Sequence, residues 1–433
     1  MLVAKPAETH DLIIRGARVL DPGEGIDAIL DVRIDRGTIA ELGSRLEPNA
    51  HRVVDGEGLL LAPAFVDPHV HLRTPGREDE ETIASGTRAA AAGGYCAILA
   101  MPNTDPVVDS SAVLGSLIET AQTEAEIPVG FLAAITRGQE GAELTEMAEL
   151  SEAGAVGFSD DGRPVVAPGL MRRALQYGGV TPRPLAVHCE EPTLSRGGQM
   201  HEGAVSAELG LAGYPSVAES VMVERDLLLA AYEHRSIHIL HVSASESVEA
   251  VRAAQSAGVR ATAEATPHHL CRTDESVRTL DPNLKMNPPL RSADDRSSLV
   301  EAVRDGTVQA IATDHAPHAR HEKEVPFEAA PFGVTGLETA FAALYTHLVE
   351  PGLIRLETLL QRMTSGPAGI YSLAAPRIAP GEPANVVLLD LRASRRIEAG
   401  DFRSRSVNSW LLGEPLTGGV KLTVAAGRVV YES

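Results

Sequence analysis

The chain has 433 residues, of which 38 are Lys or Arg and 59 are Asp or Glu, so its formal net charge is −21. This acidity argues against sequence-independent binding to nucleic acid and against docking on anionic lipid, since both need a basic surface. Hydrophobic residues make up 44% of the chain, which excludes wholesale disorder, and no apolar run approaches the roughly 18 residues of a membrane span.

The opening sequence and the cysteines indicate a compartment. MLVAKPAETHDLIIRG has no apolar segment of the kind found in secretory signals. Cys96, Cys189 and Cys271 are odd in number and far apart, which argues against a disulfide framework. We therefore expect a cytoplasmic protein.

Both ends of the chain have the pattern of short strands. Near the start, DLIIRGARVL, DVRIDRGTIAELG and HRVVDGEGLLLAP alternate apolar and polar residues and are interrupted by Gly, Asp and Pro. Near the end, ANVVLLDL and GGVKLTVAAGRVVYES follow the same pattern. This suggests one small sheet domain built from both ends, although the pattern does not distinguish it from two separate β caps.

From about residue 62 to 370 the chain alternates between apolar runs and helix-length segments. The eight runs are AFVDP, YCAILAMP, IPVGFLAAI, AVGFSDD, RPLAVHCE, IHILHVS, VRATAEATP and VQAIATDH. Helical patterns lie between most of them, such as EETIASGTRAAAAGG, LMRRALQYGG and SVEAVRAAQSAG. Strands buried on both faces have this nearly continuous apolar pattern, and eight β-α units predict a closed (β/α)8 barrel. An open doubly wound sheet is the alternative, but its usual Gly-rich phosphate turn is not seen.

Histidines and aspartates stand where these runs end. In a barrel the carboxyl ends of the strands form the catalytic face. A single histidine there is more often a hydrogen-bonded core residue, but a set of four histidines with aspartates favours a metal site. The polar residues in question are Asp67, His69, His71, Asp160, Asp161, His188, His241, Asp314 and His315.

The number and spacing of these residues predict two cations. His69 and His71 are two residues apart, so on an extended strand both imidazoles project to one face. The candidate ligands exceed what one tetrahedral zinc needs, which favours two metals bridged by an aspartate and a water. Because such a water has a lowered pKa, the expected reaction is hydrolysis at a carbonyl, or its reverse.

Arg73 lies two residues beyond His71 and shares its face if the strand continues. A guanidinium beside two cations is not a ligand, and its fork suits a substrate carboxylate. The alternative is an ion pair at the rim with Glu78 or Asp79.

Three further polar residues follow the runs. Asn103 and Asn287 have the hydrogen-bonding groups to hold a substrate, although each also fits a turn. His318, four residues past Asp314, has the position to hold substrate or to orient a ligand.

Taken together, these motifs resemble the dihydroorotases of the cyclic amidohydrolase superfamily. DPHVHLRTPG at 67–76 resembles the signature D-x-H-x-H-x-R-x-P-G, and ATDHAPHARHEK at 312–323 resembles the second signature. Further blocks match in order: MPNT at 101–104, GFSDDG at 157–162 and NPPLR at 287–291. The resemblance spans nearly the whole chain. One departure is Thr74, which stands at a variable position where many members carry an acid.

The resemblance implies a bacterial long form with two Zn²⁺ per subunit. It assigns His69, His71 and Asp314 to one ion and His188 and His241 to the other. It places a bridging aspartate within the pair Asp160–Asp161, of which we choose Asp161. The absence of a lysine at this strand end argues against dihydropyrimidinases and allantoinases. Asp314 is the implied catalytic base, and the implied substrate-binding residues are Arg73, Asn103, Asn287, His318, Phe332 and Gly333.

The implied reaction is the reversible cyclisation of N-carbamoyl-L-aspartate to (S)-dihydroorotate, the third step of pyrimidine biosynthesis. A hydantoinase or allantoinase activity and a non-catalytic subunit of an aspartate transcarbamoylase complex are the alternatives. The resemblance also implies a barrel at 62–371, a β-sandwich domain from 1–61 and 372–433, a homodimer and possible association with aspartate transcarbamoylase.

Overall fold

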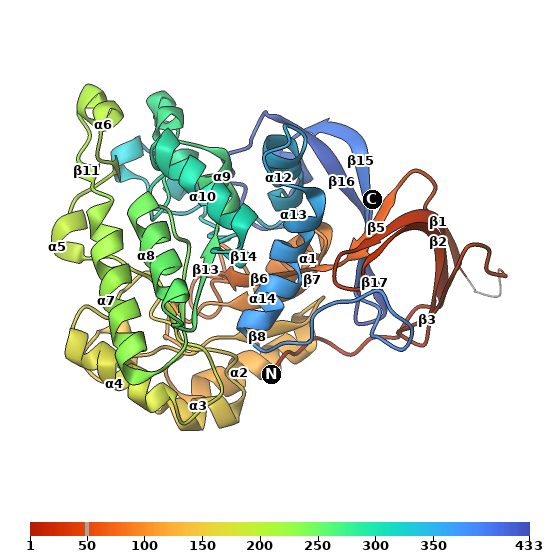
Figure 1. Ribbon diagram of the computed structural model, residues 1–433, viewed down its shortest axis with the longest axis horizontal. Coiled ribbons are helices and arrows are strands. Elements are labelled where there is room, and N and C mark those ends of the chain that lie inside the picture. The colour runs from red at the N-terminus through yellow and green to blue at the C-terminus, as the bar shows by residue number, and fades with distance from the viewer. Residues whose placement is uncertain (48–51) are drawn as a thin grey trace.

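Strands from both ends of the chain share one sheet, which lies beside a barrel (Figure 1). The computed structural model describes residues 1–47 and 52–433. His51, which begins the predicted strand segment HRVVDGEGLLLAP, therefore lies outside the described residues. The described sheet has the order β17-β16-β15-β5-β1-β2-β3, with β4 paired to β1, and antiparallel pairing of β15 with β5 joins the two ends of the chain. Its strands are β1 (Leu12–Asp21), β2 (Ile26–Asp35), β3 (Thr38–Gly43), β4 (Arg52–Asp55), β5 (Leu60–Pro63), β15 (Val386–Arg396), β16 (Pro415–Ala425) and β17 (Arg428–Glu432).

The apolar residues of this sheet form a core of their own. Leu12, Ile14 and Val19 of β1 pack with Leu61 of β5 and Val386 of β15, all of them buried. The alternation in β1 breaks between Ile14 and Ala17, where the register shifts and Gly16 has a φ of 64°. A bulge with glycine in the left-handed region explains this break in the pattern.

The predicted parallel barrel is confirmed, and it closes through single bridges. Strands β6-β7-β8 form one parallel sheet and β14-β13-β12-β9 another. Parallel bridges from Phe158 to Ala133 and to Leu185, and from Val70 to His315, connect the two sheets into a ring. The fourth predicted run therefore contributes bridges at Phe158 and not a full strand. The barrel strands are β6 (Phe65–Val70), β7 (Tyr95–Ala100), β8 (Val129–Phe131), β9 (Ala186–Val187), β12 (Ile237–Ile239), β13 (Ala261–Ala265) and β14 (Ala310–Ile311).

Helices follow the barrel strands and surround the ring (Figure 1). Their ends carry capping residues: α1 begins after Thr82, whose side chain accepts from the Ser85 N–H, and α10 ends at Gly306, which has a φ of 96°. The larger helices are α1 (Ile83–Ala92), α2 (Ser111–Glu124), α3 (Met147–Ala153), α4 (Pro168–Gly178), α7 (Val217–Glu233), α8 (Ser245–Ser256), α10 (Ala293–Asp305), α13 (Leu356–Met363) and α14 (Ser365–Ile370).

Shorter elements lie mainly in the loops between barrel strands and helices. They are α5 (Pro192–Ser195), β10 (Met200–His201), α6 (Ala204–Leu209), β11 (Gly213–Tyr214), α9 (Pro267–Cys271), α11 (Arg320–Lys323) and α12 (Ala340–Leu344). None of the described helices is long and apolar enough to cross a membrane.

Candidate metal centre

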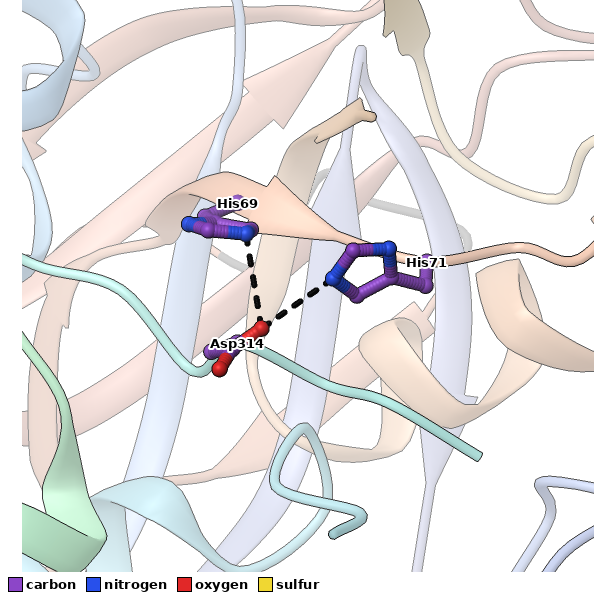
Figure 2. Close-up of side chains that lie close together, drawn as sticks. All are labelled: His69, His71 and Asp314. Carbon is purple, nitrogen blue, oxygen red and sulfur yellow. Dashed lines mark hydrogen bonds and ion pairs between the residues drawn. The ribbon is translucent and has the colours of Figure 1, made fainter. Parts of the chain in front are cut away.

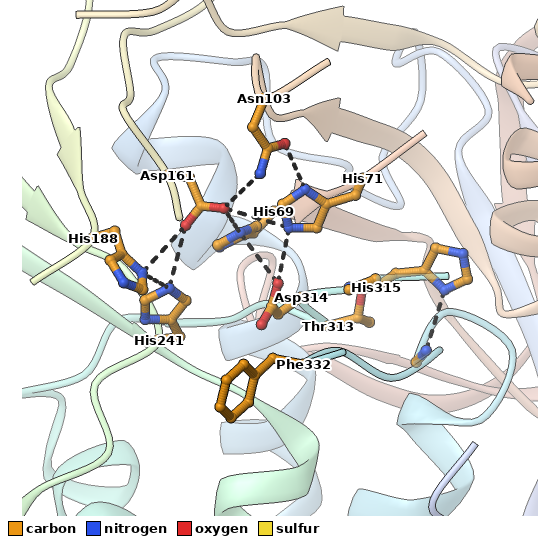
Figure 3. A network of polar contacts seen from close by, with 12 residues as sticks. His69, His71, Asn103, Asp161, His188, His241, Thr313, Asp314, His315 and Phe332 are labelled. Atoms are coloured by element: carbon orange, nitrogen blue, oxygen red, sulfur yellow. Dashed lines mark hydrogen bonds and ion pairs between the residues drawn. The ribbon is translucent and has the colours of Figure 1, made fainter. Parts of the chain in front are cut away.

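The six predicted ligands meet at the carboxyl ends of the barrel strands, and all of them are buried (Figure 3). One lies on β6 and one just beyond it, and the others follow the Phe158 bridges, β9, β12 and β14. They are His69, His71, Asp161, His188, His241 and Asp314.

Two imidazoles and a carboxylate form the first group of candidate ligands (Figure 2). The rings of His69 and His71 lie with centroids 5.3 Å apart. Asp314 Oδ1 lies 3.1 Å from His71 Nε2 and 3.4 Å from His69 Nε2. These three ligand atoms face one point, although His71 and Asp314 are 243 residues apart in the chain. Two imidazoles and one carboxylate are a common set of protein ligands for one zinc ion.

Asp161 lies between this group and a second pair of imidazoles (Figure 3). His188 Nδ1 and His241 Nε2 are 2.9 Å apart. Asp161 Oδ1 faces this pair, 3.3 Å from His241 Nε2, whereas Oδ2 lies 3.6 Å from His69 Nε2 and 3.5 Å from His71 Nε2. One carboxylate that presents one oxygen to each group has the geometry of a bridging ligand.

Asp160, the fallback for this role, is engaged elsewhere. Its carboxylate accepts hydrogen bonds from the backbone N–H groups of Ile135 and Thr136, at 2.7 and 3.0 Å. Burial raises the pKa of this carboxyl to about 6. Asp160 therefore holds the loop after β8 and does not face the imidazoles.

Partners outside the group orient three of the imidazoles. His69 Nδ1 donates to Glu264 Oε1 at 2.7 Å, His71 Nδ1 to Asn103 Oδ1 at 2.9 Å, and His188 Nε2 to Glu190 Oε2 at 3.0 Å. Since these partners accept a hydrogen bond from one ring nitrogen, the other nitrogen presents its lone pair to the centre of the group.

A cation fits the space between these side chains. His69 Nε2 is buried and has no hydrogen-bond partner among the described residues. Burial opposes protonation of His188, but the carboxylates of Asp161 and Glu190 raise its pKa to about 10. The neighbouring carboxylates therefore favour a positive charge at this position, which a proton on His188 supplies when no metal is bound. A divalent cation that binds the imidazole nitrogen displaces this proton.

The backbone at the site is strained. His241, Asp314 and Arg73 have φ values of 31°, 48° and 57°, in the left-handed region that residues with a side chain rarely adopt. Beneath them, Asp67 accepts from the N–H groups of His69 and Thr313, each at 3.1 Å. These bonds tie the end of β6 to the end of β14, so the strained ligands are held by packed strands.

A cavity of about 390 Å³ opens over the ligands. Arg73, Asn103, Asn287, Phe332 and Gly333, all predicted to bind substrate, line it together with His71, Asp161, His188, His241 and Asp314. Gly333 has a φ of 131°, and a Cβ there would lie 2.8 Å from the Ala316 Cβ, so only glycine fits.

Arg73 reaches the cavity by a different path from the one expected. Strand β6 ends at Val70, so Arg73 does not continue the face of the two histidines. Its Nε lies 3.0 Å from Glu80 Oε2 and donates to the Pro317 carbonyl at 3.1 Å. The acid beside it is Glu80, whereas the sequence suggested Glu78 or Asp79.

The other predicted substrate-binding residues differ in how many of their hydrogen-bonding groups already have a partner within the protein. Asn287 Nδ2 donates to Glu190 at 2.9 Å, which leaves its buried Oδ1 without a partner among the described residues. Asn103 directs its amide to His71 and Asp161. His318 lies beside the cavity, where its Nε2 donates to the Phe332 carbonyl at 2.8 Å.

Three functional carboxylates were not identified from the sequence. Glu264 stands inside the apolar run VRATAEATP, and a charge in a buried strand needs a partner, which was the available signal. Glu190 is two residues past His188 and contacts it directly, a spacing that could also have identified it. No sequence pattern singles out Glu80.

The chain is similar in sequence and in fold to known proteins. Residues 58–247 match the family model "Dihydro-orotase-like". A dihydroorotase from Pelotomaculum thermopropionicum is 45% identical over 421 residues, covering 97% of this chain and 98% of that protein. A dihydroorotase from Geobacter metallireducens is 43% identical over 423 residues, covering 98% and 100%. The solved L-hydantoinase (dihydropyrimidinase) from Arthrobacter aurescens superposes with a TM-score of 0.87 at 26% identity, covering 98% of this chain and 96% of that one.

Proposed function

Because the chain belongs to the dihydroorotase family, we propose that its barrel site interconverts N-carbamoyl-L-aspartate and (S)-dihydroorotate. The observation that carries this proposal is that five of the six predicted metal ligands line one cavity together with a largely buried arginine, and the sixth, His69, lies against them. The set suits attack on a cyclic amide, and the arginine suits a substrate that bears a carboxylate.

The ligand groups suit two zinc ions. His69, His71 and Asp314 would hold one ion and His188 and His241 the other, with Asp161 between them. When bound, the ions lower the pKa of a water molecule and polarise the amide carbonyl.

Asp314 is the residue we assign to proton transfer. Burial opposes its ionisation, but His69 and His71 hold the pKa of its carboxyl below the usual range. An ionised carboxylate at neutral pH accepts a proton from the attacking water and delivers it to the leaving ring nitrogen. In the synthetic direction the Asp314 carboxylate takes the proton from the attacking carbamoyl nitrogen and delivers it to the departing hydroxide, which leaves as water.

Arg73 and Asn287 orient the substrate. The Arg73 Nε is occupied, and in the described part of the chain neither Nη group donates a hydrogen bond, so both are available to bind a carboxylate through two parallel bonds. The buried Asn287 Oδ1 accepts from a ring N–H. Together they hold the amide carbonyl over the ligand group, which lowers the entropic cost of reaction.

Steady-state turnover tests the proposal. Hydantoins and allantoin lack the carboxylate that Arg73 would bind, so kcat/KM for dihydroorotate should exceed theirs by about 100-fold or more. A preference for hydantoin or allantoin would replace the proposal with that of a related cyclic amidohydrolase.

Elemental analysis separates an enzyme from a non-catalytic subunit. We expect about two zinc ions per chain, as two ligand groups require. Near-zero metal after gentle purification would favour a structural subunit of an aspartate transcarbamoylase complex.

The proposal includes assembly and location. A homodimer, association with aspartate transcarbamoylase and a cytoplasmic location are implied by the family resemblance, and the three buried free cysteines agree with a reducing compartment. Light scattering with and without the transcarbamoylase tests both forms of assembly.

A further inference from the structure

A buried carboxylate lies directly behind Arg73. Glu80 is 0% exposed and sits just before α1. Its Oε2 lies 3.0 Å from Arg73 Nε, and its Oε1 contacts the Arg77 guanidinium and lies 3.2 Å from His318 Nδ1. One acid thus contacts two residues assigned to the substrate side of the cavity.

The charges around Glu80 show what it does. The Arg73 side chain is 12% exposed, and both burial and the neighbouring Arg77 lower the pKa of its guanidinium. Glu80 is the carboxylate that contacts both arginines within 4 Å. Without its charge, Arg73 loses its ion-pair partner and keeps a like-charged neighbour, so the guanidinium would turn away.

Glu80 also connects Arg73 to the segment over the cavity. His318 Nε2 donates to the Phe332 carbonyl at 2.8 Å, and its Nδ1 lies 3.2 Å from Glu80 Oε1. The Ser406 hydroxyl donates to the Glu80 carbonyl at 2.7 Å, which fixes the backbone of Glu80 as well. The position of Arg73 and the position of Phe332 therefore depend on the same buried acid.

The same side chains have the composition of a cation site, but an arginine occupies the position. Ligand atoms of Glu80, His318 and Glu322 lie within 4.8 Å of one another. The Arg77 guanidinium contacts both Glu80 and Glu322. Since the guanidinium groups of Arg73 and Arg77 together balance these two carboxylates, the cluster is an ion-pair network.

We infer that Glu80 is a positioning residue that holds Arg73 and His318 in place to receive the substrate carboxylate, and so sets the preference for carboxylate-bearing cyclic amides. The inference rests on the proposed function. Glu80 does not line the cavity, whereas Arg73 does, and Glu80 acts through Arg73, whose Nε lies 3.0 Å from its carboxylate.

The test is a Glu80→Gln variant, which keeps the size and removes the charge. We expect KM for dihydroorotate to rise about 10- to 100-fold, the effect of losing one charged hydrogen-bonding contact, with kcat within about threefold. Glu80→Asp, which keeps the charge, should recover part of the loss. Asp79→Asn, an exposed acid one residue away, is the matched control.

A double-mutant cycle distinguishes positioning from simple stabilisation. If Glu80 acts through Arg73, Glu80→Gln should cost less than about threefold in kcat/KM when Arg73 is already alanine. An unchanged KM in Glu80→Gln, or a full additional loss in the Arg73→Ala background, would overturn the inference.

Direct binding separates this inference from the proposed function. In the Asp314→Asn background, calorimetry measures dihydroorotate binding without turnover. A wild-type chain that binds dihydroorotate but does not convert it would refute the proposed function, and the loss of affinity with Glu80→Gln would still support the role of Glu80. A chain that does not bind dihydroorotate would overturn both.

Discussion

The most informative single substitution is Glu264→Gln, which removes one charge and no volume. Glu264 lies on β13, is 0% exposed, and accepts from His69 Nδ1 at 2.7 Å and from His238 Nε2 at 3.0 Å. Burial opposes its ionisation, but His238 and His69 lower the pKa of its carboxyl to about 2. A glutamine at this position has one carbonyl oxygen, so it accepts from only one imidazole and turns its amide N–H groups toward the other.

The size of the effect follows from the loss of that contact. A hydrogen bond to a charged group contributes about 1.5–3 kcal/mol, which corresponds to about 10- to 150-fold in a dissociation constant. His69 would then lose its fixed orientation, and its Nε2 would face the centre for only part of the time. We expect the affinity for one zinc ion to fall by this factor and kcat to fall with it.

Competition with a fluorescent zinc chelator measures the two dissociation constants. Only one of them should change, because His188 and His241 do not contact Glu264. Glu338→Gln is the matched control, since this carboxylate also accepts from two donors, the backbone N–H groups of Arg403 and Ser404, but contacts none of the predicted ligands. A dissociation constant within about threefold of wild type for both ions would refute the idea that Glu264 orients His69.

Three further predictions follow from the same contacts. Asp314→Asn should reduce turnover at least about 100-fold while the circular dichroism spectrum is retained, and turnover above a tenth of wild type would reject Asp314 as the base. Arg73→Ala should cost about 2–4 kcal/mol in kcat/KM for dihydroorotate and little for hydantoin, so equal losses on both substrates would argue against carboxylate binding. Burial and Lys285 lower the pKa of Lys323 to about 7, from an ordinary value of 10.5. The folded state therefore binds fewer protons than the unfolded state between these values, and stability should rise with pH there by at most about 1.4 kcal/mol per unit. Urea unfolding of wild type and Lys323→Met measures this, and identical slopes would contradict it.

The course of the chain was readable from periodicity. Strands buried on both faces need continuous apolar runs, and the spacers between them carry the helical period, so the barrel followed from local pattern alone. The histidines were also accessible, because polar side chains at the ends of buried strands are rare enough to stand out in a linear sequence. The prediction of a full strand at Phe158 was wrong. The apolar pattern there is that of a strand, but Phe158 makes only single bridges.

Choices between neighbouring side chains required the tertiary structure. Asp160 and Asp161 are equivalent in sequence pattern, and only the fold turns one toward a backbone loop and the other toward the imidazoles. The contact of Glu264 with His69 spans 195 residues.

By itself, the sequence determined most of the strands and helices and which residue types stand at the strand ends. Only the tertiary structure decided which oxygen faces which imidazole, and which acid holds Arg73. The physical reason is that secondary structure depends on neighbours along the chain, whereas charge pairing in a buried site depends on groups brought together by packing distant strands.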